Sequence, residues 1–137
     1  MANEKELVAS LLSSDWETRA KAESALYNAS QDIVPDLVDI IKQSLDDKNR
    51  SARRVGAWIV YKIGIRITNS HLRTLATAAL VDALKDGDEG LRKNAAWGLS
   101  AIGSSSTAEP LKSACQDKSA DVRDAAQYAL QQVSSRA

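Results

Sequence analysis

The chain has 137 residues, of which 44% are hydrophobic, and its 18 Lys and Arg balance its 18 Asp and Glu. This length suits one domain with a buried core, and zero net charge disfavours binding to nucleic acid or membrane by electrostatics alone. With one Cys and one His, disulfide frameworks and sites that need two of either residue are excluded. No apolar run approaches the roughly 18 residues of a membrane span, and the first residues lack a secretory pattern. We therefore expect a cytoplasmic protein.

Four similar units follow one another along the chain, at about residues 4–30, 33–64, 70–103 and 107–133. In each, a stretch with apolar residues at helical spacing is followed by a short polar turn and a second such stretch. Equivalent positions are marked by one arginine per unit, namely Arg19, Arg53, Arg92 and Arg123. Recurrence at this period predicts a repeat protein in which each unit is a helical hairpin.

The start of each second helix is predicted by the residue four positions before its arginine. These residues are Asp15, Asn49, Asp88 and Ser119, all of types whose side-chain oxygen accepts hydrogen bonds from the first amides of a helix. A single hairpin cannot bury both of its apolar faces, whereas stacked hairpins can. We therefore predict an all-α fold, an α-solenoid of four stacked helical hairpins that forms one domain over residues 1–137.

The third unit carries the clearest family resemblance. Its segment from Leu84 to Gly103 reads LKDGDEGLRKNAAWGLSAIG. It resembles a HEAT-like repeat of the phycobilisome-lyase type, whose pattern is Leu-Lys-Asp-x-Asp-Pro-x-Val-Arg-x-x-Ala-Ala-x-Ala-Leu-Gly-x-Ile-Gly. The fourth unit matches well, the second fairly, and the first keeps little beyond its cap, Arg19, Ala22 and Leu26. The resemblance implies a HEAT/armadillo-like superhelix and a role as an adaptor, a scaffold or a protein of bilin attachment.

In the family pattern this arginine reaches the acidic turn of an adjacent unit. An aspartate stands six residues before the arginine in each of the last three units. We expect these side chains to form a structural ladder between units and not a ligand site; they are Arg53, Arg92, Arg123, Asp47, Asp86 and Asp117.

The second helices are expected to line the concave face, with the variable positions of the pattern turned to solvent. Trp58, Trp97 and Tyr128 occupy one equivalent position in three successive units, so they would form an aromatic stripe across that face. Exposed aromatic residues are typical of binding hot spots; the alternative is that these rings complete the core. The predicted partner-binding residues are Arg54, Trp58, Lys62, Lys93, Asn94, Trp97, Asp124, Tyr128 and Gln132.

The sequence offers little chemistry for catalysis. It has no glycine-rich phosphate loop, no Ser-His-Asp set and no metal-ligand spacing, so we expect a non-catalytic protein without metal or cofactor. Our first hypothesis is a scaffold, adaptor or inhibitor that binds a helix, loop or tail of another protein in its concave groove. The alternatives are a chromophore-handling protein and, less favoured because Asp124 lies beside Tyr128, a nucleic-acid-binding module. A small-molecule ligand is not expected.

Overall fold

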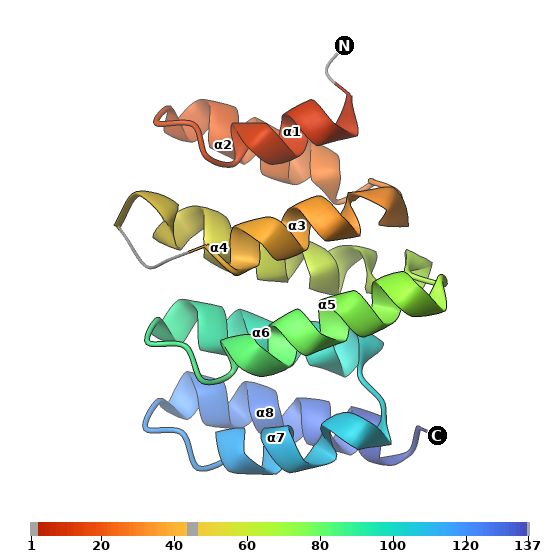
Figure 1. Ribbon diagram of the computed structural model, residues 1–137. Helices are drawn as coiled ribbons and strands as arrows, with labels where there is room; N and C mark the ends of the chain where they lie inside the picture. Colours follow the sequence, from red (N-terminus) through yellow and green to blue (C-terminus); the bar gives the residue numbers. More distant parts are fainter. Residues whose placement is uncertain (1–2, 44–46, 137) are drawn as a thin grey trace.

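The computed structural model describes residues 3–43 and 47–136, apart from the side chains of residues 47 and 48. Over these ranges the chain forms eight α-helices, three short 3₁₀ turns and no strand. The helices pair into successive hairpins that stack in two layers, with α1, α3, α5 and α7 in one layer and α2, α4, α6 and α8 in the other (Figure 1). The predicted all-α solenoid is confirmed. The helices are α1 (Glu4–Ser10), α2 (Trp16–Leu26), α3 (Val34–Ile41), α4 (Asp47–Ile63), α5 (Ser70–Ala83), α6 (Glu89–Ile102), α7 (Ala108–Ala114) and α8 (Ala120–Ser134).

Three of the four predicted second-helix starts are confirmed. The side chains of Asp15, Asp88 and Ser119 each accept a hydrogen bond from a backbone amide in the first turn of α2, α6 and α8. The prediction for Asn49 is wrong, because α4 already begins at Asp47 and Asn49 lies inside its first turn. An aspartate in the first turn of a helix is itself favoured by the helix dipole, so this sequence supports the earlier start equally well.

Small residues bring helices close together, both within a unit and between neighbouring units. Ala95, Ala96 and Leu99 of α6 are fully buried. A Cβ atom at Gly98 would lie 2.6 Å from Leu80 Cδ1, and one at Gly64 would lie 2.8 Å from the Cβ atom of Ala101. None of the described glycines has a positive φ, so these two are required by the close approach of helices and not by the backbone conformation.

The first unit is held less extensively than the others. In α2 only Ala22 and Leu26 are buried, whereas eight residues of α6 are buried. Helix α2 also makes far fewer contacts with α4 than α4 makes with α6. Polar bonds supplement this packing: Arg66 donates hydrogen bonds to the carbonyl oxygens of Tyr27 and Ala29. Gln31 accepts from the amides of Thr68 and Asn69, so the segment after α4 is tied to the segment after α2.

Candidate interaction surface

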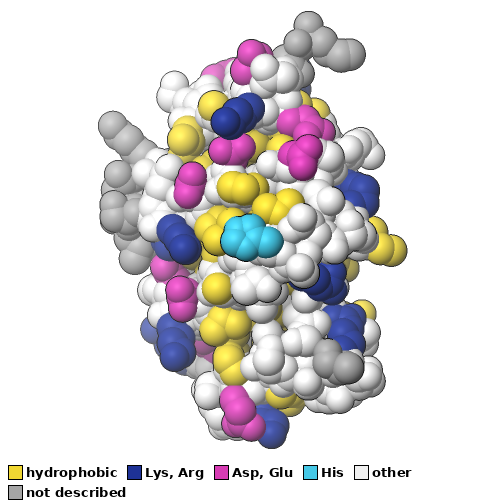
Figure 2. Space-filling model, turned by 45° about the vertical axis from the view of Figure 1, so that its right-hand side comes forward, with side chains coloured by type: hydrophobic (Ala, Val, Ile, Leu, Met, Phe, Trp, Pro, Cys, Tyr) yellow, Lys and Arg dark blue, Asp and Glu magenta, His cyan; other side chains and the backbone are white. Residues whose placement is uncertain are grey.

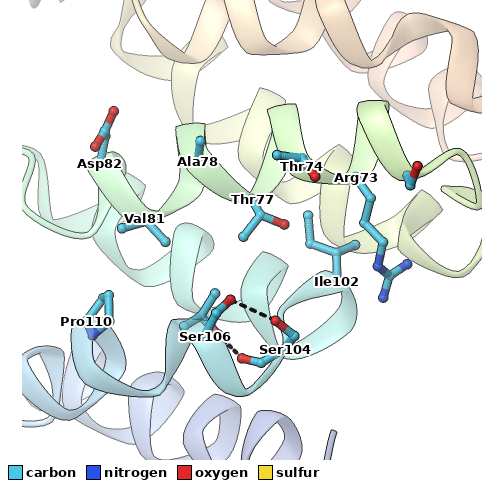
Figure 3. Close-up of a pocket in the computed structure, with 12 residues that line it drawn as sticks. Arg73, Thr74, Thr77, Ala78, Val81, Asp82, Ile102, Ser104, Ser106 and Pro110 are labelled. Carbon is cyan, nitrogen blue, oxygen red and sulfur yellow. Dashed lines mark hydrogen bonds between the residues drawn. The ribbon is translucent and has the colours of Figure 1, made fainter. Parts of the chain in front are cut away.

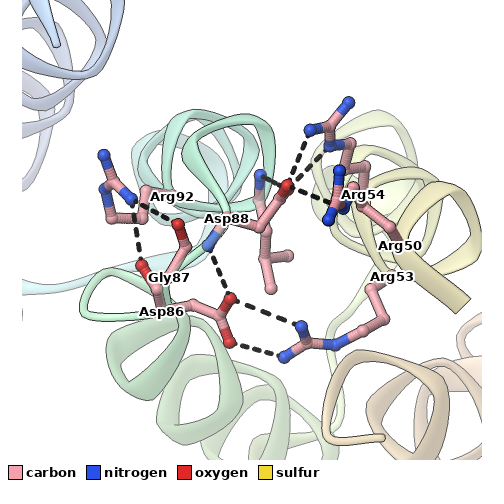
Figure 4. A network of polar contacts seen from close by, with 8 residues as sticks. Arg50, Arg53, Arg54, Asp86, Gly87, Asp88 and Arg92 are labelled. Carbon is pink, nitrogen blue, oxygen red and sulfur yellow. Dashed lines mark hydrogen bonds and ion pairs between the residues drawn. The ribbon is translucent and has the colours of Figure 1, made fainter. Parts of the chain in front are cut away.

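Two arginines of the second helices, Arg53 and Arg92, reach the turn of the following unit; Figure 4 shows the contact of Arg53. Arg53 donates to both carboxylate oxygens of Asp86, at 3.3 and 2.6 Å, and to the carbonyl oxygen of Ile41 at 3.0 Å. Arg92 donates to both carboxylate oxygens of Asp117, at 2.9 and 3.1 Å. Both arginine side chains are only 7% exposed. These pairs link unit two to unit three and unit three to unit four.

The arginines of the first and fourth units do not contact another unit through the hydrogen bonds described here. Arg123 donates to the carbonyl oxygen of Asp117, six residues earlier, at 2.8 Å. Arg19 makes the equivalent bond to Ser13 at 2.7 Å. Both arginines therefore hold the turn of their own unit. The side chain of Asp47 lies outside the described residues.

The aspartate at each turn has two roles. Asp86 accepts from the amide of Asp88, and Asp117 accepts from the amide of Ser119, each at 2.9 Å, so each carboxylate also fixes its own turn. Burial, the largest single influence, raises the pKa of both carboxyls, but it is outweighed by the hydrogen bonds from Arg53 and Arg92 together with those from the backbone amides and the arginine charges. As a result, the pKa of Asp86 and of Asp117 lies below the ordinary value of 3.8.

These lowered pKa values predict a loss of stability in acid. A carboxyl whose folded-state pKa is below its unfolded value stabilises the fold above the unfolded value, about 3.9 for Asp, and that contribution is lost as the pH falls through the folded value. We expect the melting temperature, followed by circular dichroism, to be nearly constant between about pH 5 and pH 7 and to fall below about pH 4. The Asp86→Asn/Asp117→Asn variant should melt lower at neutral pH and lose less on acidification. An equal acid-induced fall in melting temperature in the parent protein and the variant would show that Asp86 and Asp117 are not responsible for the loss of stability.

A second set of polar contacts joins α4 to α6. Arg54 donates to both carboxylate oxygens of Asp88 at 2.6 Å, and Arg50 lies 3.6 Å from the same carboxylate (Figure 4). The guanidinium of Arg54 passes over Gly90, where a Cβ atom would lie 2.4 Å from Arg54 Nε. Asn94 donates to the carbonyl oxygen of Arg54 at 2.9 Å. Arg54 and Asn94, which were expected to face a partner, thus hold two units together.

Four aromatic residues form a continuous row across the layer of second helices. We call Trp58, Tyr61, Trp97 and Tyr128 the aromatic row. The ring centroids of neighbouring members lie 4.9, 5.8 and 5.1 Å apart in that order, with tilted planes. Trp58, Tyr61 and Trp97 are partly buried, and Tyr128 is 43% exposed. The row is therefore packed on one side and open on the other, between the two arrangements that the sequence suggested.

Tyr27 and Lys62 extend the row towards the first unit. Lys62 Nζ lies 5.5 Å from the ring centroids of both Tyr27 and Trp58, within the range of a cation–π interaction. The hydroxyl of Tyr27 donates to the carboxylate of Glu23. Burial, and then the hydrogen bond and charge of Glu23, raise the pKa of Tyr27 to about 12. The Tyr27 hydroxyl is therefore neutral at physiological pH.

Tyr27 and Tyr61 were missed by the sequence argument, although a signal was present. The same offset of 34 residues that aligns Arg19 with Arg53 also aligns Tyr27 with Tyr61. In addition, Tyr61 follows Trp58 by three residues, which places both on one face of a helix.

The other predicted binding residues lie around the row. Lys93 lines a small pocket together with Arg54, Glu89 and Asp121, so its charge has acidic neighbours. Asp124 is exposed on α8, and Gln132 is half-buried on the same helix.

A second feature adjoins the aromatic row at Tyr61. A pocket of about 550 Å³ lies at the ends of α4 and α6, and its lining contains three cationic residues and no acidic one. Figure 2 shows a run of Lys and Arg side chains down the corresponding right-hand edge of the molecule. We call this site the basic pocket; it is lined by Tyr61, Lys62, Ile65, Arg73, Ala101 and Arg136.

The opposite layer carries a pocket of about 530 Å³ between α5 and the start of α7 (Figure 3). Its lining combines hydroxyl groups, among them Thr74, Thr77 and Ser106, with apolar residues such as Ile102 and Val81. The hydroxyls of Ser104 and Ser106 lie 2.8 Å apart and hydrogen-bond to one another. Within the described ranges, no group of three or more His, Cys, Asp and Glu could hold a metal ion.

Comparison with known proteins agrees with this architecture. A family model described as HEAT repeats matches residues 65–131, which contain the third unit and most of the fourth. The match and the solenoid fold support a HEAT-like repeat protein, a class that is generally non-catalytic and commonly serves as a protein-interaction scaffold. The match is to HEAT repeats in general and does not single out the phycobilisome-lyase type. A search of curated proteins finds no match. In the described part of the chain, no helix is long and apolar enough to cross a bilayer.

Proposed function

We propose that this protein is a non-catalytic interaction module that binds a segment of another protein along the aromatic row. In this proposal residues 1–137 act as one domain of four hairpins, and the face of α4, α6 and α8 that carries the row is the binding surface. The observation that carries the proposal is the row itself, which contains four of the six aromatic residues of the chain and remains open on one side.

The contacts between the rings suit recognition of an extended partner. Because the row crosses α4, α6 and α8, one elongated segment can touch three units at once. Each ring lies within about 6 Å of the next, so the surface is ordered before a partner arrives and loses little side-chain entropy on binding. Exposed aromatic anchors of this kind contribute much of the affinity in many interfaces.

Tyr128 offers the sharpest test of the proposed function, because it is the most exposed ring of the row. We expect Tyr128→Ala to weaken binding of a ligand peptide by about tenfold, as for a moderate hot spot, with little change in melting temperature. The probe is a set of short fluorescein-labelled peptides in which leucines alternate with acidic, neutral or basic residues, measured by fluorescence anisotropy.

The matched control is Trp16→Ala, which removes an aromatic side chain that is 70% exposed and lies outside the row. This control should leave peptide binding unchanged. If no peptide of the set binds, or if Tyr128→Ala binds as tightly as the parent protein, the aromatic row is not a binding surface.

A further inference from the structure

We propose that the basic pocket binds carboxylate side chains, and that the partner of this protein is therefore an acidic peptide segment. Its apolar side chains would lie on the aromatic row, and its carboxylates, at one end, would enter the pocket. This inference rests on the proposed function and names the chemistry of the partner.

Three elements converge on the basic pocket, each with one cation. Lys62 comes from α4, Arg73 from α5, and Arg136 from the segment after α8. Arg73 donates to the carbonyl oxygen of Ile67 at 3.0 Å, and Arg136 donates to that of Gly103 at 3.2 Å. Lys62 lies over two aromatic rings. All of these partners are neutral, so they orient the cations without cancelling their charge.

Most N–H donors of these side chains are not used in the hydrogen bonds described here. A guanidinium has five N–H donors and an ammonium has three, whereas Arg73 donates two hydrogen bonds, to the carbonyl oxygens of Ile67 and Ala101, and Arg136 donates one. Carboxylates accept such bonds with favourable geometry, especially from arginine. The pocket therefore combines positive charge with donors suited to a carboxylate.

The cations at the other end of the same helices have acidic neighbours. Near the start of α6, Arg54 is paired with Asp88, and Lys93 shares its pocket with Glu89 and Asp121. Carboxylates of the protein therefore already compensate the positive charge there. The basic pocket differs from this region in that its lining contains three cations and no carboxylate.

The pocket and the aromatic row form one continuous surface. Tyr61 belongs to both, since it lies between Trp58 and Trp97 in the row and also lines the pocket. Ile65, at the rim, is 86% exposed and can contact the aliphatic part of a bound acidic side chain. A peptide that contacts the row at Tyr61 is therefore also next to the pocket.

The distribution of acidic residues favours a peptide over a nucleic acid. Asp124 is exposed one helical turn before Tyr128, and the chain has no net charge. A polyanion with a charge at every step along the row would therefore approach a carboxylate at the α8 end. A peptide that places its carboxylates only at the Lys62 end avoids this repulsion.

The test compares three probes on the intact chain: a peptide with alternating leucines and a glutamate-rich end, the same peptide with glutamine in place of glutamate, and a single-stranded oligonucleotide of equal net charge. We expect the glutamate peptide to bind at least about tenfold more tightly than the glutamine peptide, as expected for charge-assisted hydrogen bonds. The Arg73→Gln/Arg136→Gln variant, which changes two pocket cations that make no ring contact with the row, should bind the glutamate peptide about tenfold more weakly while its affinity for the glutamine peptide stays unchanged.

The matched control is Lys112→Gln, which removes an exposed lysine of α7 that is paired with Glu109 and should leave all affinities unchanged. Melting temperatures identify any variant that fails to fold, and added salt on the parent protein provides a measurement without substitution, because it should weaken only the glutamate peptide. The proposal is overturned if the two peptides bind equally, if the double variant binds the glutamate peptide like the parent, or if the oligonucleotide binds more tightly. If the aromatic row is not a binding surface but the basic pocket is, the Tyr128→Ala variant still binds the glutamate peptide as tightly as the parent protein. This result distinguishes failure of the proposed function from failure of the pocket proposal.

Discussion

Arg53→Ala is expected to lower the free energy of unfolding by about 3–5 kcal/mol, the usual cost of breaking a buried ion pair from one side. The side chain of Arg53 is 7% exposed and that of Asp86 is 13% exposed, so the substitution leaves a poorly hydrated carboxylate without its cation. The carbonyl oxygen of Ile41 also loses a donor. Urea denaturation followed by circular dichroism measures the change.

Two further variants show whether the ion pair is responsible. Lys112→Ala disrupts an exposed pair, in which the side chains are 59% and 84% exposed, and should change stability by less than about 1 kcal/mol. Arg53→Met/Asp86→Leu removes both charges and should recover part of the loss, because no unpaired charge remains. A loss below about 1 kcal/mol in Arg53→Ala would show that the pair is effectively solvated.

Gly64→Ala is expected to destabilise the protein by about 3 kcal/mol, at the upper end of the range for overpacking. The added Cβ would lie 2.8 Å from the Cβ atom of Ala101 and 3.1 Å from Cγ2 of Ile102. The Cβ atom of Ala101 cannot rotate away, so the 3₁₀ turn that follows α4 has to separate from α6. Differential scanning calorimetry measures the loss of stability.

Gly90→Ala is the matched control for this substitution. The same atom is added, but it meets only the flexible end of Arg54, which can move aside at the expense of its bond to Asp88. Because alanine also favours the helix by up to about 1 kcal/mol over glycine, we expect little net change. Equal effects at both glycines would contradict the view that the contact of α4 with α6 is rigid at Gly64.

The sequence predicted those features that repeat with the period of the units. The three correct helix starts were found because a capping residue recurs four positions before an arginine. The start of α4 was misplaced because Asp47, Asn49 and their neighbours are all compatible with a helix end, and local preferences do not choose between them. The arginine of each unit was likewise recognisable as a recurring mark, whereas the contacts of Arg53 and Arg92 with the following unit depend on how the hairpins stack.

Features that depend on the relative placement of units were beyond the sequence argument. Arg54 occupies a position that points away from the core, so it was interpreted as a binding residue. The structure shows that the missing side chain of Gly90 lets its guanidinium cross to Asp88. The basic pocket was not foreseen either, since Lys62, Arg73 and Arg136 belong to three different elements and share no spacing. Only the stacking of hairpins brings them together.

The limited burial of α2 has a consequence for how the molecule responds to force. Neighbouring hairpins in a solenoid hold one another, so the weakest junction sets where the stack comes apart. Units two to four are connected by two nearly buried ion pairs and by the close contacts of α4, α6 and α8. A load applied at the amino terminus would therefore peel away the first hairpin and leave the other three intact as a mechanical unit. The aromatic row lies wholly on those three hairpins, and its geometry would survive the loss of the first.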